Sequence, residues 1–342
     1  MNRSIESQRM QRSARHSERS LGRKVVPVTR LASALVVGAI LVLPTEVIAQ
    51  GLTFNKGQSI SPAFEGWEEN EDGSFNIVFG YMNRNWEGEV DLSPGPDNGF
   101  SPGPADRGQP THFLPRRNRF VFRVQVPADF GDQELVWTLR SDGETLKAYG
   151  SLRPDYFIDN VVMMSETGTL GAGTSDPELR AHAPPSLTLE TPTEIEAQVG
   201  ERVQLVAHVT DDGLPRADPG RLPLTDEGEL DFDLAVNRFI PVRITVDKTV
   251  GLHMAWFVYR GPEEVNAQEA ISLDPPQVHV WEDTRPYSNS PWAPFWIPPE
   301  PPEDGRWITE VIFQEPGTYV LRGRADDGGL FTDTDVTVRV QP

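Results

Sequence analysis

The chain has 342 residues, 37% of them hydrophobic, so it is long enough for about two domains with apolar cores. Its 31 prolines and 29 glycines favour many short strands joined by turns over long helices. The formal net charge of −20 argues against binding to nucleic acid or anionic membranes, and the absence of cysteine excludes disulfides, thiolate metal sites and a lipid-anchored lipoprotein.

Residues 1–49 have the pattern of a signal peptide for general secretion. Eight Lys and Arg residues precede an apolar run at 31–43, and Val47-x-Ala49 supplies a cleavage site. The run has 13 residues, shorter than the roughly 20 that span a bilayer, so we expect cleavage rather than an uncleaved anchor, and no membrane insertion afterwards. Cleavage leaves 23 basic and 48 acidic residues, a net charge of −25, which favours binding of divalent cations.

Period-two alternation predicts an antiparallel β-sandwich domain over residues 50–160. The segment 74–81 places apolar side chains on one face, and the segment 119–126 does the same with Phe120, Phe122, Val124 and Val126. The segment 134–149 carries a turn signal at Asp142-Gly143, which predicts a hairpin. Six prolines and four glycines within 93–115 exclude regular structure there.

A second sandwich domain is predicted over residues 187–342, after a linker over 161–186 in which no period persists. Its apolar faces are Val203, Leu205, Ala207 and Val209; Met254, Trp256 and Val258; Tyr319, Leu321, Gly323 and Ala325; and Val336, Val338 and Val340. Two long Pro-containing insertions, at roughly 213–240 and 282–306, interrupt the strands. The predicted fold class is therefore all-β, with two antiparallel sandwiches in tandem.

Three segments of the C-terminal half are distinctive: VQLVAHVTDDGLP at 203–215, AWFVYRGPEEV at 255–265 and PGTYVLRGRADDGGLFTDTDVTVRV at 316–340. Through them, residues 187–340 resemble the PKD-type immunoglobulin-like domains of bacterial surface and secreted proteins. Residues 52–160 resemble immunoglobulin or fibronectin domains more generally. The resemblance implies adhesion, spacing or ligand presentation outside the cytoplasm, and it covers less than half of the chain.

The sequence contains no signature of a catalytic site. The nucleophile elbow, the zinc-protease helix, the phosphate-binding loop and the dinucleotide glycine pattern are all missing from it. The six histidines are scattered, and His208 and His253 fall on polar-side positions of strands. We therefore predict no catalytic residues and a protein that is not an enzyme.

Acidic turns are the candidate metal ligands. Asp212, Asp326, Asp327 and Asp335 are predicted at strand ends, and calcium is bound by six to eight oxygens that loops of this kind supply. The alternative is that these aspartates only form turns, because Asp-Gly sequences bond their own backbone. Calcium is the one cofactor that the sequence suggests.

The second insertion and the strand after it hold the candidate ligand-binding residues. They are Trp281, Tyr287, Trp292, Phe295, Trp296 and Trp307, interspersed with prolines. Flat aromatic faces can bind sugars, proline ligands or protein anchors. The alternative, which we favour, is that the loop folds back and covers its own sandwich, because so many exposed tryptophans promote aggregation.

These features predict a secreted or periplasmic, non-enzymatic binding or structural protein of the cell envelope, with a protein or glycan as its partner. Two alternatives stay open. The chain could be an accessory subunit of a secreted enzyme or envelope complex, or it could bind or act on carbohydrate. The basic side chains Arg84, Arg116, Arg117 and Arg119 either bind an acidic glycan or, as we favour, pair with carboxylates of the same chain.

Overall fold

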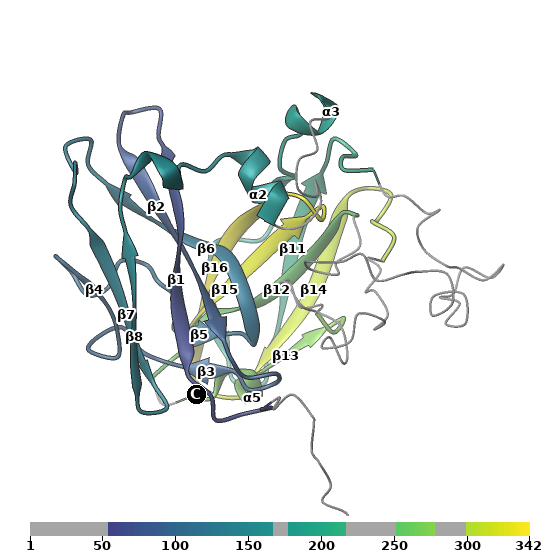
Figure 1. The fold of residues 1–342 in the computed structure, drawn as a ribbon. Helices are drawn as coiled ribbons and strands as arrows, with labels where there is room; N and C mark the ends of the chain where they lie inside the picture. The colour runs from purple at the N-terminus through teal and green to yellow at the C-terminus, as the bar shows by residue number, and fades with distance from the viewer. Residues whose placement is uncertain (1–53, 167–176, 217–250, 264, 278–298) are drawn as a thin grey trace, which may run out of the picture. The chain divides into compact units, whose positions relative to one another are not determined.

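The computed structural model describes residues 54–166, 177–216, 251–263, 265–277 and 299–342. Nearly all of its regular structure is β, and the helices η1 (Pro154–Tyr156), α2 (Asn160–Glu166), α3 (Pro177–Arg180) and α5 (Ala267–Ala270) are short. Among the helices described, none combines the length and apolar content that crossing a membrane requires. The all-β fold class predicted from the sequence is confirmed (Figure 1).

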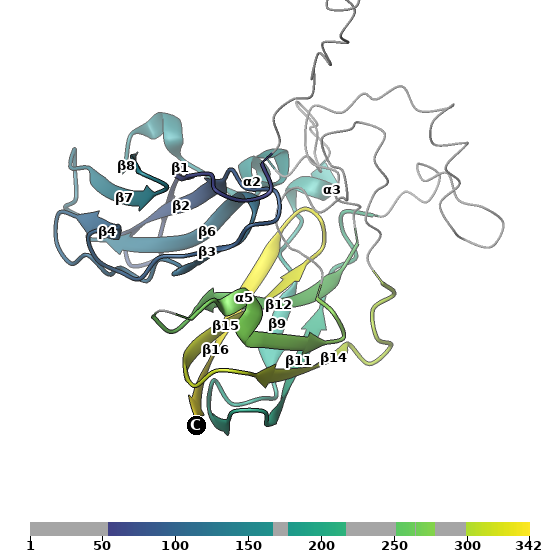
Figure 2. The same cartoon turned by 90° about the horizontal axis from the view of Figure 1, so that it is seen from below.

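The first sandwich consists of two antiparallel three-stranded sheets and a short two-stranded ladder (Figures 1 and 2). One sheet has the order β1 (Ile60–Glu69), β2 (Phe75–Asn83), β6 (Arg116–Val126). The other has the order β4 (Asn98–Ser101), β7 (Leu135–Ser141), β8 (Glu144–Gly150). The short ladder pairs β3 (Val90–Asp91) with β5 (His112–Phe113). Strands β4 and β5 lie within 93–115, so the prediction of no regular structure there was wrong: short strands fit between the prolines. In immunoglobulin notation the two sheets are A-B-E and C-F-G.

The predicted hairpin is present as β7 and β8, which pair from Leu135↔Gly150 to Ser141↔Glu144. Its turn residues Asp142 and Gly143 have φ values of +46° and +76°. Positive φ at both central positions defines the type I′ turn, whose twist matches that of a two-residue hairpin. The Asp-Gly signal in the sequence therefore predicted the turn correctly.

The core of the first sandwich forms around Phe79, Phe122 and Trp137, all buried between the two sheets. Phe120 was predicted to share the face of Phe122, and this prediction was wrong. The register between β2 and β6 shifts between Phe79 and Tyr81, and Phe120 has a φ of +51°. Such a bulge re-aims one side chain, and Phe120 packs against the opposite face of the sheet.

The second sandwich consists of two sheets of four strands each; one is wholly antiparallel, and the other has three antiparallel strands and a fourth, β10 (Glu194–Gln198), that pairs in parallel. The first sheet has the order β9 (Ser186–Leu189), β11 (Arg202–Thr210), β14 (Arg306–Phe313), β13 (Ile271–Asp274). The second has the order β12 (His253–Arg260), β15 (Gly317–Asp326), β16 (Phe331–Gln341), β10 (Glu194–Gln198). These orders are A-B-E-D and C-F-G, with β10 added in parallel to the last strand.

Two details reinforce the immunoglobulin-like description of the second sandwich. Trp256 on the C strand is only 1% exposed within the core. Tyr319, near the start of the F strand, donates from its hydroxyl to the carbonyl of Glu315 at 2.9 Å, the arrangement known as a tyrosine corner. All the apolar faces predicted for the second half point into this core, and Trp137 and Trp256 are buried as their alternating strands predicted.

The segment predicted as a linker, 161–186, packs at both of its described ends. Helix α2 buries Met163 and Met164. Beyond α3, His182 is 3% exposed and is held by carboxylates of the second sandwich. The described parts of the linker are therefore fixed against the sandwiches.

Candidate functional site

Direct hydrogen bonds join the two sandwiches along strand β12. The carbonyl of Tyr259 accepts the N–H of Thr111 at 3.1 Å, and the Thr111 hydroxyl oxygen accepts the N–H of Gly261 at 3.0 Å. The guanidinium of Arg260 pairs with Asp106 at 2.7 Å. An edge strand engaged in this way is covered, so it is not open for pairing with another chain over these residues.

Tyr259 is the anchor of this contact. Its ring is 4% exposed and belongs to the core of the first sandwich, while its hydroxyl donates to the carbonyl of Gly108. The Arg322 guanidinium lies 3.5 Å from the centre of the ring, donates to the carbonyl of Val121 at 2.7 Å and pairs with Asp335. The cation–π contact lies within the second sandwich and holds the two side chains in place. The bonds to the carbonyls of Gly108 and Val121 cross to the first sandwich, so they resist separation of the sandwiches.

An apolar seam completes the contact. It is formed by Val78, Phe120, Ile158, Met163, Met164 and Leu330. Leu330 comes from the turn between β15 and β16 and is 2% exposed, whereas the other members come from the first sandwich and α2. Residues 52–342 accordingly form one compact unit. Motion of the sandwiches relative to each other is opposed by this apolar contact together with the hydrogen bonds and ion pair described above.

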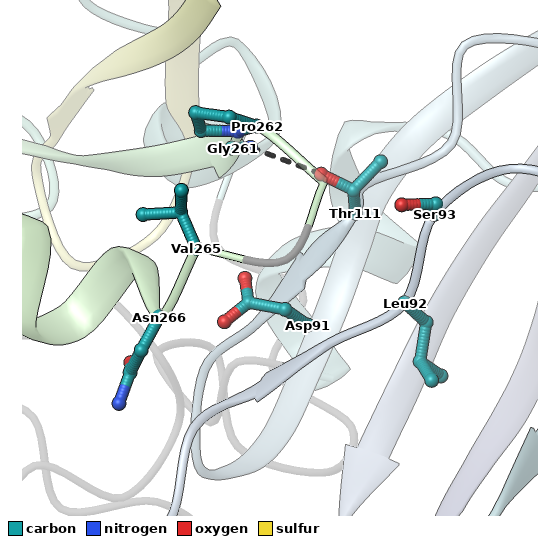
Figure 3. A pocket seen from close by; sticks show the side chains of 8 residues that line it. All are labelled: Asp91, Leu92, Ser93, Thr111, Gly261, Pro262, Val265 and Asn266. Carbon is teal, nitrogen blue, oxygen red and sulfur yellow. Dashed lines mark hydrogen bonds between the residues drawn. The ribbon is translucent and has the colours of Figure 1, made fainter. Parts of the chain in front are cut away.

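A small pocket of about 230 Å³ lies at the same junction (Figure 3). Its lining is Asp91, Leu92, Ser93, Thr111, Gly261, Pro262, Val265 and Asn266. The first four residues come from the first sandwich and the other four from the loop between β12 and α5. The pocket exists only because the two sandwiches meet.

His112 lies buried beside this pocket between two carboxylates. Its Nδ1 is 2.8 Å from Asp91 and its Nε2 is 2.7 Å from Glu89. Burial alone lowers the pKa of His112, but the hydrogen bonds and negative charges of Asp91 and Glu89 outweigh burial and raise that pKa to about 9. Because both ring nitrogens are engaged, His112 is a charged structural group and is not offered to a substrate.

A second buried histidine lies at one end of the second sandwich. Both oxygens of Asp212 are 3.1 Å from Nδ1 of His182, and Asp327 is 3.1 Å from Nε2. Both contacts are hydrogen bonds if the ring is charged and donates from both nitrogens, or if one carboxyl carries the proton and donates it to a neutral ring. Burial raises the pKa of Asp327 to about 7, so a protonated Asp327 is accessible near neutral pH. This cluster pins the end of the linker to the sandwich.

The structure brings three of the four predicted calcium ligands together. Asp212 and Asp327 share His182, and Asp326 is the neighbour of Asp327 in the same turn, 1% exposed. Asp335 lies elsewhere, in a bidentate pair with Arg322 at 2.7 and 2.8 Å. Within the described ranges no group of three or more His, Cys, Asp or Glu side chains is arranged to hold a metal. Calcium stays a prediction.

The predicted aromatic site falls mostly outside the described residues. That is the case for Trp281, Tyr287, Trp292, Phe295 and Trp296. Trp307 is described: it lies on β14 and packs, partly buried, against the core of the second sandwich. Because Trp307 lies on a strand after the insertion, its packing does not test whether the insertion folds back, and the choice between packing and recognition stays open.

An aromatic strip that sequence reasoning missed lies on the first sandwich. Phe157 and Tyr156 are 46% and 45% exposed, and they pack edge-on against Trp67 and Phe64 at centroid distances of 5.1 and 5.2 Å. The Trp67 N–H is fixed by the carbonyl of Arg153 at 2.8 Å. No periodicity marks this strip, because Tyr156 ends the three-residue helix η1 and Phe157 caps it.

The basic side chains of the first sandwich pair within the chain. Arg84 contacts Glu144 at 3.3 Å, Arg117 contacts Glu65 at 2.6 Å and Arg119 contacts Glu166 at 2.7 Å. Arg116 lies 3.7 Å over the ring of Trp86. For Arg84, Arg117 and Arg119 the predicted pairing with the chain's own carboxylates is confirmed.

His253 was expected on the solvent side of its strand, and this expectation was wrong. It is 2% exposed at the start of β12, opposite Asp326 on β15. The roles of His112, His182 and Tyr259 were also missed. Each depends on residues about 20 to 150 positions away, which local alternation does not reveal.

Comparisons with known proteins assign no family to this chain. No family model matches the chain, and no curated protein matches it. Solved structures that overlap it include a chimeric titin Z1Z2 (10% identity, 83% of this chain and 99% of that chain, TM-score 0.21) and the Yersinia pseudotuberculosis adhesin InvE (9%, 85% and 61%, TM-score 0.22). Domains 4 and 5 of the S-layer protein SbsC overlap at 8% identity, 83% and 98% coverage and a TM-score of 0.21. TM-scores this low carry no argument about the fold, so the description of the fold here rests on the strand order of the chain itself.

Proposed function

We propose that the protein is an exported, non-enzymatic binding or structural protein of the cell envelope or extracellular space. The observation that carries the proposal is the junction: a buried apolar seam, the Tyr259 anchor and the Arg260–Asp106 pair join the sandwiches. A fixed pair of sandwiches holds its loops at a set spacing. Because little freedom is then lost on association, such a unit is suited to presenting or spacing binding surfaces.

The export part of the proposal rests on the N-terminal pattern of basic residues, apolar run and Val47-x-Ala49. The partner part rests on charge, since a chain of net charge −20 is repelled by nucleic acid and anionic membranes, which favours a protein or glycan. The PKD-type resemblance of residues 187–340 agrees with a role outside the cytoplasm, and membership of that family is part of the proposal.

Co-sedimentation with isolated envelope polymers tests the proposal. The purified protein is mixed with peptidoglycan, envelope polysaccharide and membrane protein fractions, and both retention and release of soluble products are measured. We expect saturable retention on one fraction with no product. Release of sugar or peptide in proportion to protein and time contradicts the non-enzymatic assignment, and an absence of retention on every fraction contradicts the binding assignment.

A carbohydrate-binding role is the second candidate, and the aromatic strip favours it. Tyr156 and Phe157 are about half exposed and are held in place by Phe64 and Trp67. Rigid aromatic faces bind at a low entropic cost. A glycan array with the wild type and a Tyr156→Ala/Phe157→Ala double variant tests it. Binding that survives the double variant excludes the strip as the site.

A further inference from the structure

The junction pocket has the dimensions of a site for one small group. At about 230 Å³ it lies below the 300 to 1,000 Å³ that is usual for drug-sized ligands, so it suits a single side chain or a small molecule. Asp91 is the charged residue in its lining. Figure 3 shows the Asp91 carboxylate extended between the two sandwiches, toward Val265 and Asn266.

The Asp91 carboxylate has acceptor capacity left. An ionised carboxylate offers about four lone-pair positions. His112 takes one on Oδ1 at 2.8 Å, and the Ala267 N–H takes one on Oδ2 at a long 3.3 Å. The Asp91 side chain is still 30% exposed. Counting the partners in the described part of the chain, two positions therefore remain for a donor that enters the pocket.

The charges around the pocket favour a cation. Glu89 and Asp91 flank His112, whose raised pKa of about 9 keeps it positively charged at neutral pH, so these three side chains retain one net negative charge. Arg260, the nearby cation of the second sandwich, is paired with Asp106. The remaining negative charge therefore attracts a cation into the pocket.

The remaining lining combines hydroxyls with apolar walls. The Thr111 oxygen accepts the Gly261 N–H, which leaves the Thr111 oxygen one further lone pair, and the Ser93 hydroxyl lies beside Thr111 (Figure 3). Pro262 and Val265 supply aliphatic surface on the opposite side. Oxygen acceptors at one end and aliphatic walls at the other match a charged head on a short methylene chain.

We propose that the junction pocket binds a primary alkylammonium group, with Asp91 as its counter-ion and Pro262 and Val265 along its methylene chain. This goes beyond the proposed binding or structural role, since it assigns a site and a ligand class. The ammonium donates to the Asp91 carboxylate and to the Thr111 and Ser93 oxygens. Because residues from both sandwiches form the pocket, the bound amine also tightens the junction.

The test is a titration of the purified protein, followed by NMR or calorimetry, with butylammonium and its neutral analogue 1-butanol. We expect saturable binding of butylammonium and at least tenfold weaker binding of 1-butanol. Nα-acetyl-lysine amide and cadaverine then distinguish a lysine side chain from a free diamine as the source. Equal binding of the amine and the alcohol overturns the proposal, as does an absence of butylammonium binding.

Two variants and a matched control locate the site. Asp91→Asn keeps the shape and removes the charge, and we expect at least a tenfold loss of butylammonium affinity. Asp97→Asn removes the same charge from an exposed position nearby, 63% exposed, and is expected to leave binding unchanged. Should Asp91→Asn fail to fold, Ser93→Leu fills the pocket while keeping Asp91, and it should abolish binding. Binding that survives Ser93→Leu, or that falls equally in Asp97→Asn, places the amine elsewhere and overturns the proposal.

Discussion

The two buried tryptophans, Trp137 and Trp256, differ in whether the indole N–H has a hydrogen-bond partner. Trp137 donates from Nε1 to Asn98 Oδ1 at 3.0 Å, and both residues are fully buried. Trp256 is equally buried, yet its Nε1 has no hydrogen-bond partner among the described residues. A buried polar group without a hydrogen-bond partner destabilises the folded state. Removing one member of a buried hydrogen bond therefore destabilises the protein, because the other member is left without a partner.

Replacing each tryptophan by phenylalanine therefore has unequal effects. Trp137→Phe leaves Asn98 Oδ1 unsatisfied, while Trp256→Phe removes an N–H that was already unsatisfied. We expect Trp137→Phe to lower the free energy of unfolding by about 1–3 kcal/mol more than Trp256→Phe does. Urea denaturation of the two variants measures the difference. Equal losses would show that the Trp137–Asn98 bond contributes nothing net.

His112 makes the free energy of unfolding fall as the pH becomes alkaline. Its pKa in the folded state is about 9, against about 6.5 in an unfolded chain. Between these values the folded protein binds more protons than the unfolded one, so stability is fully present below pH 6.5 and is lost as pH rises through 9. The loss amounts to roughly 3 kcal/mol. Denaturation at pH 6 and pH 9.5 should show it, and His112→Asn should flatten that pH dependence.

Strands illustrate what local sequence determines. A turn at Asp142-Gly143 and alternation in Leu135–Ser141 specify β7 and β8, because both depend on neighbours within a few residues. The pairing of β11 with β14, which are about 100 residues apart, has no local signal. Phe120 followed the alternation but faces the seam, because the bulge that turns it outward depends on its pairing with β2. The candidate site lies at a junction of distant segments, so alternation could not predict it.

The β7–β8 turn gives a test of the backbone alone. Gly143 has a φ of +76°, and a Cβ added there meets nothing within 4 Å. Gly143→Ala therefore introduces conformational strain without a clash and should cost about 1–2 kcal/mol. Asp142→Asn, at the neighbouring position with φ of +46°, should be nearly neutral because Asn tolerates this region. Urea unfolding of both variants is the measurement. A neutral Gly143→Ala would contradict the assigned turn.

At the scale of the whole molecule, the seam couples the two sandwiches. Leu330 is the second sandwich's buried contribution to it, and Leu330→Ala should cost about 2–5 kcal/mol, as for other buried leucines. We expect calorimetry to show one transition in the wild type and two separated transitions in the variant. Ile308→Ala, at a 43% exposed position of the second sandwich, is the control that should keep one transition. Two transitions in the wild type would contradict the coupling.

The N-terminal segment of the chain is expected to be removed on export. The basic segment, the apolar run at 31–43 and Val47-x-Ala49 predict cleavage near Ala49. N-terminal sequencing of the exported protein should therefore begin near Gln50. A product that keeps residues 1–49 and stays with the membrane contradicts the prediction.

The parallel pairing of β10 with β16 bears on mechanical strength. Their register runs from Glu194↔Thr337 to Gln198↔Gln341, so the segment that opens this sheet and the segment that ends the chain point the same way. A tensile force that pulls the start of one and the end of the other in opposite directions acts along both strands. The ladder is then loaded in shear, with its hydrogen bonds sharing the force, whereas a hairpin pulled at its open end unzips one bond at a time. Sliding β10 past β16 in this way therefore requires the hydrogen bonds of the whole ladder to break together.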